Sequence, residues 1–256
     1  MPSNNAFSPV FIYVADQTYF FKSFLRNSFR KGFEWEEFSR QAYTIGYKST
    51  GIIALTGFIL GFVLTLQSQP TMKQFGAVSF IPGMVAISVI REIGPVIVAL
   101  ICAGKISSSI GAELGSMNVT EQIDAMEVSG ANPMQYLVVT RIIACVVMIP
   151  LLTIFADIIA LIGGFAATNL DSSMSPWLYF YKSTAVLEFS DILPSFIKTI
   201  LFGFAIGFVG CYKGFHSNRG TESVGLAANS AVVTASVWII VIDAIVVQIT
   251  NVFIYT

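Results

Sequence analysis

The sequence predicts an all-α integral membrane protein in which interfacial amphipathic helices precede about five transmembrane helices. Hydrophobic side chains make up 55% of the 256 residues and charged side chains only 11%, whereas about 25% of residues are charged in an average soluble domain. Five apolar runs are long enough, as helices, to cross a hydrocarbon layer of about 30 Å. Their approximate cores are residues 51–66, 83–103, 142–167, 196–212 and 231–253.

The first 48 residues differ from the rest, because basic side chains alternate with aromatic and aliphatic ones. This pattern is typical of a helix that lies in the membrane interface with its apolar face in the lipid. We therefore expect an interfacial amphipathic segment over residues 1–48 and a transmembrane domain over residues 49–256. The bases of the first segment are Lys22, Arg26, Arg30, Lys31, Arg40 and Lys48.

Loop charges predict the orientation, since cytoplasmic loops carry an excess of Lys and Arg. With a cytoplasmic amino terminus, ten bases lie inside: the six above and four more at Lys105, Arg141, Lys213 and Arg219. Arg91 lies within a span, and the external bases are Lys73, Lys182 and Lys198. A multi-pass protein with its amino terminus in the cytoplasm is the expectation.

The overall composition excludes several other functions. The 14 Lys and Arg nearly balance the 15 Asp and Glu, so no basic excess exists to hold nucleic acid. Three cysteines in or beside apolar stretches, without a C-x-x-C pair, and a single His do not supply a metal site. We expect no metal, no nucleic-acid partner and no cofactor in this chain.

Four ionisable side chains fall inside predicted spans, where each costs roughly 2.5 to 3.5 kcal/mol. Counting along the helices places Glu92 and Asp243 about 12 Å below the external surface, and Asp157 about 22 Å above the cytoplasmic one. Arg91 adjoins Glu92, and Lys198 is expected nearer the external surface. These five residues are the candidates for a polar, outward-facing site. The alternative is that they only stabilise the helix bundle, with Arg91 paired to an acid.

Small residues predict close helix contacts. Gly57 and Gly61 form a GxxxG motif in the first span, and Gly203 and Gly207 form another that continues to Gly210. Such motifs let helix backbones approach closely. We expect tight packing at these faces, and a homodimer held together by them.

A cytoplasmic loop is expected over residues 111–141, and it holds four acids and no base before Arg141. Asn118 and Glu121 have the spacing of a capping box, and Gly130 suits a helix stop. A short amphipathic helix over residues 119–128 would carry an acidic face, which an anionic membrane surface repels. A protein partner with basic residues fits that face better. The apolar side would hold Val119, Ile123 and Met126, opposite Glu121, Asp124 and Glu127.

Two long blocks carry a family resemblance. One runs from Arg91 to Arg141, REIGPVIVALICAGKISSSIGAELGSMNVTEQIDAMEVSGANPMQYLVVTR, and the other from Gly207 to Val233, GFVGCYKGFHSNRGTESVGLAANSAVV. They resemble the signatures of MlaE-type permeases, the membrane subunits of ABC transporters that work with MCE-domain proteins. The layout of an interfacial amino terminus and five spans matches as well, so the resemblance covers nearly the whole chain.

The resemblance implies the function. The chain would be the permease subunit that moves phospholipid between the bacterial inner membrane and an MCE-domain protein, with two permease copies and two ATPase subunits. The predicted polar residues would contact the lipid: Arg91, Glu92, Lys198, Asp243 and Asp157. The loop would carry the coupling helix that docks into the ATPase, through Glu113, Val119, Glu121, Gln122, Ile123, Asp124, Met126 and Glu127.

The chain itself carries no G-x-x-x-x-G-K-[ST] phosphate-binding loop. ATP and Mg²⁺ would therefore be bound by the partner subunit, and this chain is not expected to be an enzyme. An alternative from another class is an ion- or proton-coupled secondary carrier that uses Glu92, Asp157 and Asp243 as proton sites. A membrane enzyme is a weaker alternative, because one His and no paired Cys offer little chemistry.

Overall fold

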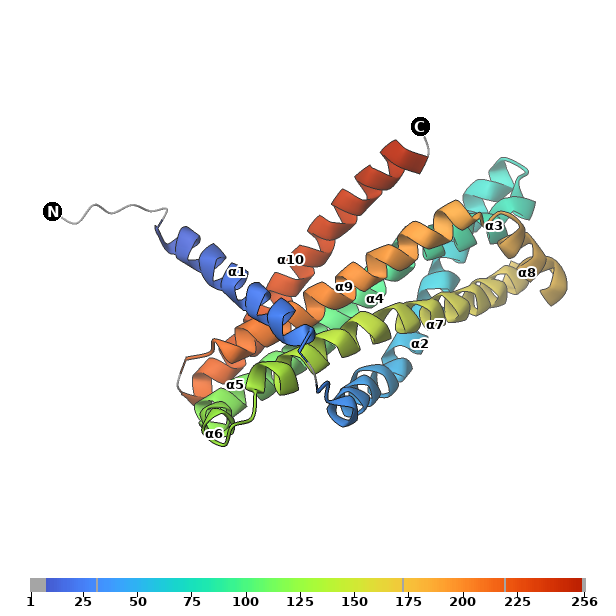
Figure 1. The fold of residues 1–256 in the computed structure, drawn as a ribbon. Helices are drawn as coiled ribbons and strands as arrows, with labels where there is room; N and C mark the ends of the chain where they lie inside the picture. The colour runs from blue at the N-terminus through green and yellow to red at the C-terminus, as the bar shows by residue number, and fades with distance from the viewer. Residues whose placement is uncertain (1–7, 31, 172, 219, 255–256) are drawn as a thin grey trace.

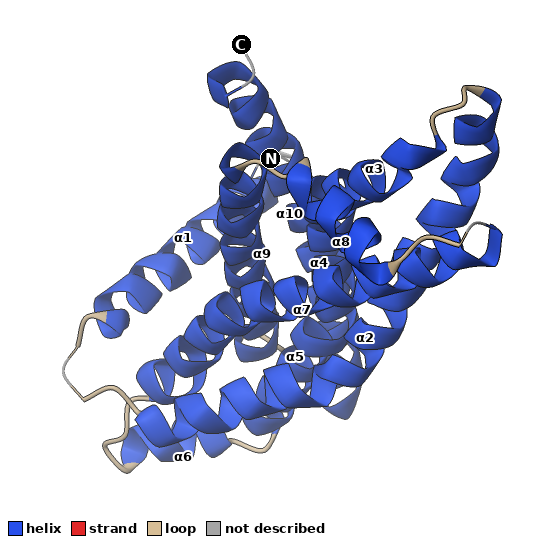
Figure 2. Ribbon diagram, turned by 90° about the vertical axis from the view of Figure 1, so that its right-hand side faces the viewer, coloured by secondary structure: helices blue, strands red, loops and turns tan. Residues whose placement is uncertain are grey.

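The computed structural model describes residues 8–30, 32–171, 173–218 and 220–254. All regular secondary structure in these residues is helical (Figure 2). The α-helices are α1 Ser8–Ser28, α2 Trp35–Gln74, α3 Ile81–Ser88, α4 Gly94–Cys102, α5 Ser108–Val119, α6 Gln122–Val128, α7 Thr140–Asp171, α8 Pro176–Ala185, α9 Phe189–Phe215 and α10 Thr221–Ile254. One 3-10 turn, η1 Val78–Phe80, and three π-helical segments, η2 Val89–Ile93, η3 Ala103–Ser107 and η4 Met134–Val139, adjoin them.

Five helices in the described residues are long and apolar enough to cross a membrane, which confirms the predicted fold class. They are Trp35–Gln74, Val78–Val119, Met134–Leu170, Phe189–Phe215 and Thr221–Val252. The second of them is built from η1, α3, η2, α4, η3 and α5 in succession. Because this helix continues to Val119, the loop expected from residue 111 begins later, and only the short helix α6 stands in it.

Helix α1 lies across the bundle and packs on α9 through aromatic rings (Figure 1). Phe20 makes edge contacts with Phe208 and Tyr212, at centroid distances of 5.6 and 5.5 Å. Phe24 lies 5.9 Å from Phe204. Helix α2 then runs without a break through residue 48. The interfacial position of residues 1–48 stays a prediction.

The glycine motifs are used within the chain. A Cβ atom added at Gly57 would lie 2.8 Å from the carbonyl oxygen of Ala156, so α2 and α7 meet backbone to backbone there. Gly203 contacts α7 in the same way. A Cβ atom added at Gly203 would lie 2.6 Å from the carbonyl oxygen of Cys145. Tight packing at these faces is confirmed. The expectation that they hold two copies together is wrong, because α7 already covers them, with η3 and α5 covering Gly210. The homodimer itself stays a prediction.

Helix α10 is the least covered span. Of its most apolar 18-residue window 17% is buried, against 50% for the windows of α7 and α9. It packs on α9 and α5, and in its outer half Asp243 and Asn251 contact Lys198 and Arg91. A long face of this helix therefore lacks a protein neighbour within the described chain.

We predict that Gly203→Ala destabilises the fold and that Gly225→Ala does not. The added methyl group at residue 203 meets a carbonyl oxygen and must push α9 from α7, which costs about 1–3 kcal/mol. Gly225 has no atom within 4 Å of an added Cβ, and alanine favours a helix by about 0.8–1 kcal/mol over glycine. Thermal unfolding of the purified protein in detergent, followed by circular dichroism, measures both. Equal melting temperatures for the two variants would contradict the close contact.

Candidate functional site

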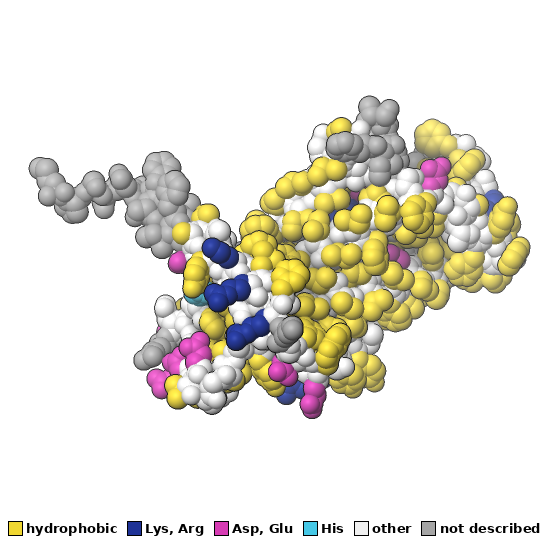
Figure 3. Space-filling view, viewed as in Figure 1, with side chains coloured by type: hydrophobic (Ala, Val, Ile, Leu, Met, Phe, Trp, Pro, Cys, Tyr) yellow, Lys and Arg dark blue, Asp and Glu magenta, His cyan; other side chains and the backbone are white. Residues whose placement is uncertain are grey.

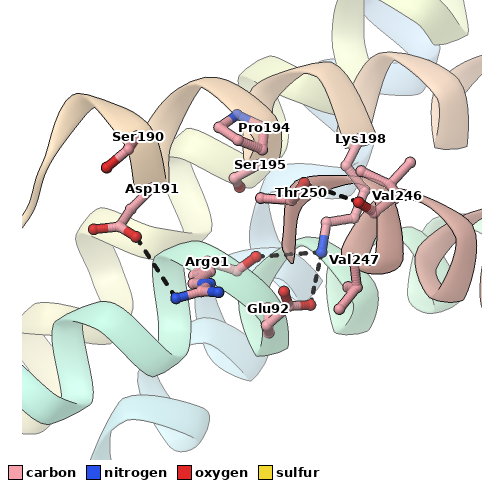
Figure 4. Close-up of a pocket in the computed structure, with 10 residues that line it drawn as sticks. All are labelled: Arg91, Glu92, Ser190, Asp191, Pro194, Ser195, Lys198, Val246, Val247 and Thr250. Carbon is pink, nitrogen blue, oxygen red and sulfur yellow. Dashed lines mark hydrogen bonds and ion pairs between the residues drawn. The ribbon is translucent and has the colours of Figure 1, made fainter. Parts of the chain in front are cut away.

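A cluster of charged side chains lies where the second spanning helix, α9 and α10 meet (Figure 4). The Nζ atom of Lys198 lies 2.7 Å from Oε2 of Glu92 and 2.9 Å from Oδ1 of Asp243. Lys198 is only 2% exposed, so one buried cation is shared by two carboxylates. The expectation that Lys198 lies nearer the surface is wrong. Helix α9 begins at Phe189, which puts Lys198 about 13 Å along the helix.

The backbone of η2 contributes to this cluster. Pro95 has no N–H group, so it cannot bond to the carbonyl oxygen of Arg91 four residues earlier, as an α-helix requires. The Lys198 ammonium group donates to that oxygen at 3.3 Å, and the hydroxyl of Ser195 donates to the neighbouring carbonyl of Ile90 at 2.7 Å. Two α9 side chains thus bond to backbone oxygens of η2. Lys198 donates hydrogen bonds to the carbonyl oxygen of Arg91 and to Oε2 of Glu92, and forms an ion pair with Asp243.

Arg91 forms the outer part of the cluster. Its guanidinium lies 3.8 Å from Oδ1 of Asp191 and donates to Oδ1 of Asn251 at 3.5 Å. Arg91 is paired with an acid, as the stabilising alternative supposes, and the acid is Asp191, which was not among the predicted site residues. The sequence did hold a sign of where Asp191 lies. Glu188 and Asp191 have the spacing of a capping box, and in the structure they form the capping box that starts α9.

Asp157 lies beside the second spanning helix near Glu92 but outside these ion pairs. An added Cβ at Gly94, two residues beyond Glu92, would touch its Oδ1 atom. Asp157 instead lines an apolar cavity of about 210 Å³ between α7 and α9, together with Thr153 and Ile158. The structure therefore separates Asp157 from the other four predicted residues.

The ion-pair cluster forms a wall rather than an enclosed pocket. The space between Arg91, Asp191, Lys198 and Thr250 has a volume of about 10 Å³, which is room for about one water molecule. The side chains of Arg91, Glu92 and Asp243 are nevertheless 30%, 37% and 24% exposed. Their open sides face away from the bundle of the described chain.

A second candidate site is the loop that holds α6. The helix begins at Gln122, after Glu121 in the left-handed conformation at φ 56°, without a side-chain cap. The expected capping box is therefore wrong: Asn118 belongs to α5 and donates from Nδ2 to the carbonyl oxygen of Ser217 at 2.7 Å. The helix stop at Gly130 is confirmed, since its φ of +83° suits glycine and its N–H closes the helix end.

The two faces of α6 follow the predicted pattern. Ile123 is buried and Met126 packs against the core. The exposed side chains are Glu121, Gln122, Asp124 and Glu127. Several acids gather at this end of the molecule (Figure 3). Val119 is half-buried at the end of α5. The short helix is thus fixed by its apolar side and presents its acidic side.

Glu113 has a structural partner. Its Oε1 atom lies 2.9 Å from the guanidinium of Arg141, and Arg141 is fully buried. The expectation that Arg141 is a loop base is therefore wrong, since the residue lies inside the bundle as a partner of α5. When Arg141 and Lys198 are left out, the predicted cytoplasmic loops still hold more Lys and Arg than the external loops. The predicted orientation therefore does not change.

Comparison with known proteins gives a consistent result. The family model described as permease MlaE matches residues 38–249. A probable ABC transporter permease protein of Rickettsia typhi is 37% identical over 202 residues, which cover 79% of this chain and 78% of the relative. Another, of Synechocystis sp., is 32% identical over 195 residues, covering 76% and 74%. A third, of Pyropia yezoensis, is 36% identical over 208 residues, covering 79% and 77%.

We predict that Lys198→Met destabilises the fold by roughly 2–4 kcal/mol, because it leaves two carboxylates facing each other without their shared cation. The partial exposure of the acids keeps the loss from being larger. Lys182→Met is the matched control, since Lys182 only bonds to the carbonyl oxygen of Ser79 at 3.3 Å on the half-exposed α8. Thermal unfolding in detergent compares the two. Similar melting temperatures would show that the ion pairs contribute nothing to stability.

Proposed function

The chain belongs to the MlaE permease family and is an ABC transporter permease, and we propose that its substrate is phospholipid. In this proposal the transporter moves lipid between the bacterial inner membrane and an MCE-domain protein of the cell envelope. A separate subunit binds ATP and Mg²⁺ and hydrolyses the nucleotide. Family membership favours this function over the ion-coupled carrier.

The observation that carries the lipid assignment is the charged wall inside a membrane bundle. Lys198 holds Glu92 and Asp243, while Arg91 stands beside them and is partly exposed. Charges at this depth are costly unless they have partners, water or a functional role. A phospholipid headgroup supplies a phosphate that Arg91 can bind by paired hydrogen bonds. Its tails can lie along the exposed apolar side chains of the neighbouring helices.

The exposed face of α10 supports a second copy of the chain. Gln248 and Asn251 are exposed in the outer half of this spanning helix, and Asn251 accepts a hydrogen bond from Arg91. Lipid offers no hydrogen bonds to the exposed sides of such polar groups. The space beside Arg91 in one chain is also far too small for a headgroup. Two copies facing each other across α10 would cover these amides and enclose a shared cavity. The charged walls would then line that cavity.

The acidic helix α6 supports docking of the ATPase subunit. In the proposed orientation the amino terminus and α6 are cytoplasmic, with the bases Lys73 and Lys182 outside. Four exposed polar or acidic side chains then meet the ATPase, whereas Ile123 and Met126 hold the helix to the bundle. The MCE-domain partner follows from the family resemblance.

We predict that Glu92→Ala and Asp243→Ala each reduce lipid transfer at least tenfold while the complex still assembles. Each substitution leaves Lys198 with one carboxylate and changes the charge of the proposed headgroup site. Transfer of a fluorescent phospholipid by the complete transporter in proteoliposomes measures the effect. Asp157→Ala is the matched control, because this acid lies outside the ion pairs. Wild-type transfer by both variants would make the cluster purely structural.

We predict that the double variant Glu121→Lys with Asp124→Lys uncouples or releases the ATPase subunit, because it reverses the charge of the docking face. Asp16→Lys with Glu36→Lys makes the same charge change at exposed sites on α1 and α2. Co-purification and lipid-stimulated ATP hydrolysis of the complex are the readouts. The docking assignment fails if the α6 variant hydrolyses ATP as the wild type does.

A further inference from the structure

Helix α1 carries a row of basic side chains that the proposed transport site does not use. Lys22 and Arg26 are four residues apart and share one face of α1, and Arg30 follows in the turn after the helix, where its N–H bonds to the carbonyl oxygen of Asn27. All three are exposed, and no ion pair is found between them and an acid of the described residues. The space-filling view shows a row of basic side chains over this part of α1 (Figure 3).

The row borders a cleft of about 770 Å³, which is within the usual range of ligand sites. Its opposite wall is formed by the segment after α6 and the end of α9, including Asn132, Met134 and Phe215. The wall is fixed to the α1 region by two hydrogen bonds. Nδ2 of Asn132 donates to Oδ1 of Asn27 at 2.7 Å, and Nε2 of Gln135 donates to the carbonyl oxygen of Gly32 at 2.7 Å.

The other faces of α1 place this cleft at the depth of lipid headgroups. Phe20 and Phe24 are buried against α9. Phe21, which also packs on Phe204 of α9, and Leu25 are partly exposed, about 100° around the helix from Lys22 and Arg26. Phe29, in the turn after the helix, is exposed as well. A helix with an exposed apolar stripe beside a basic stripe lies in the membrane interface, with the apolar side chains in the acyl region and the charges among the headgroups.

We propose that this cleft binds the phosphate of an anionic phospholipid in the cytoplasmic leaflet. The inference rests on the cytoplasmic amino terminus of the proposed function, because anionic lipid is attracted to basic clusters on that side. Three bases face the acid Glu127 across the cleft, which leaves a net charge of about +2. The site is distinct from the Lys198 cluster, since it lies on α1 at the end of the bundle where α6 stands.

Native mass spectrometry of the full-length protein tests the proposal, with equimolar dioleoyl phosphatidylglycerol and dioleoyl phosphatidylcholine added to the detergent solution. The wild type should retain phosphatidylglycerol in preference to phosphatidylcholine. The cleft variant, Lys22→Gln with Arg26→Gln and Arg30→Gln, should bind phosphatidylglycerol about 10- to 100-fold more weakly, because each base near the surface contributes to attraction.

The matched control removes three bases elsewhere, Lys48→Gln with Lys73→Gln and Lys182→Gln, and should keep the wild-type preference. Circular dichroism verifies that both variants are folded. Unchanged preference in the cleft variant overturns the proposal. So does displacement of the lipid by millimolar inorganic phosphate, which would indicate a soluble anion site. Loss of ATPase binding without a change in lipid retention would also overturn it, since the row would then dock a protein. Lipid transfer, measured separately, reports on the proposed function.

Discussion

The pairing of charges inside a membrane bundle is the interaction on which the rest of this structure depends. Lys198 is almost fully buried and forms ion pairs with two carboxylates from two other spanning helices. Removing any one partner leaves charge in a place where solvation is poor. Helix α9, the π-helical η2 and α10 are therefore tied together at one depth. The missing N–H of Pro95 extends this link to the backbone, because Lys198 also bonds to the carbonyl oxygen of Arg91.

The remaining helices divide into a rigid part and an open part. Glycines let α7 contact α2 and α9 through their backbones, so these three helices form a tightly packed unit. Helix α10 is the least buried span and leaves a face with Gln248 and Asn251 exposed. The charged wall lies at the junction of the two parts. A membrane protein that must admit a large amphipathic substrate needs such an arrangement, because the packed unit keeps its shape while the open face changes neighbours.

The sequence predicted the five spans and that Glu92 and Asp243 lie at one level of the bundle, because run length and rise per residue determine both. It also predicted that the acidic side of α6 is exposed. It did not predict which cation holds the acids, since that depends on where α9 begins and on contacts between distant helices. Asp157 shares the depth of Glu92 but lies on another side of η2, which helical counting alone cannot show. Asn118 has a capping sequence but continues a helix, because Ser217 satisfies its side chain.

The most direct test of the central claim is a cryo-electron microscopy map of the complete transporter in lipid nanodiscs. The account predicts two copies of this chain, with phosphate density within hydrogen-bonding distance, about 3 Å, of Arg91 or Lys198 at the junction with α10. Acyl-chain density should extend from that phosphate along the apolar helix faces. A map in which Lys198, Glu92 and Asp243 keep their ion pairs in every state, with lipid bound only elsewhere, would contradict the claim.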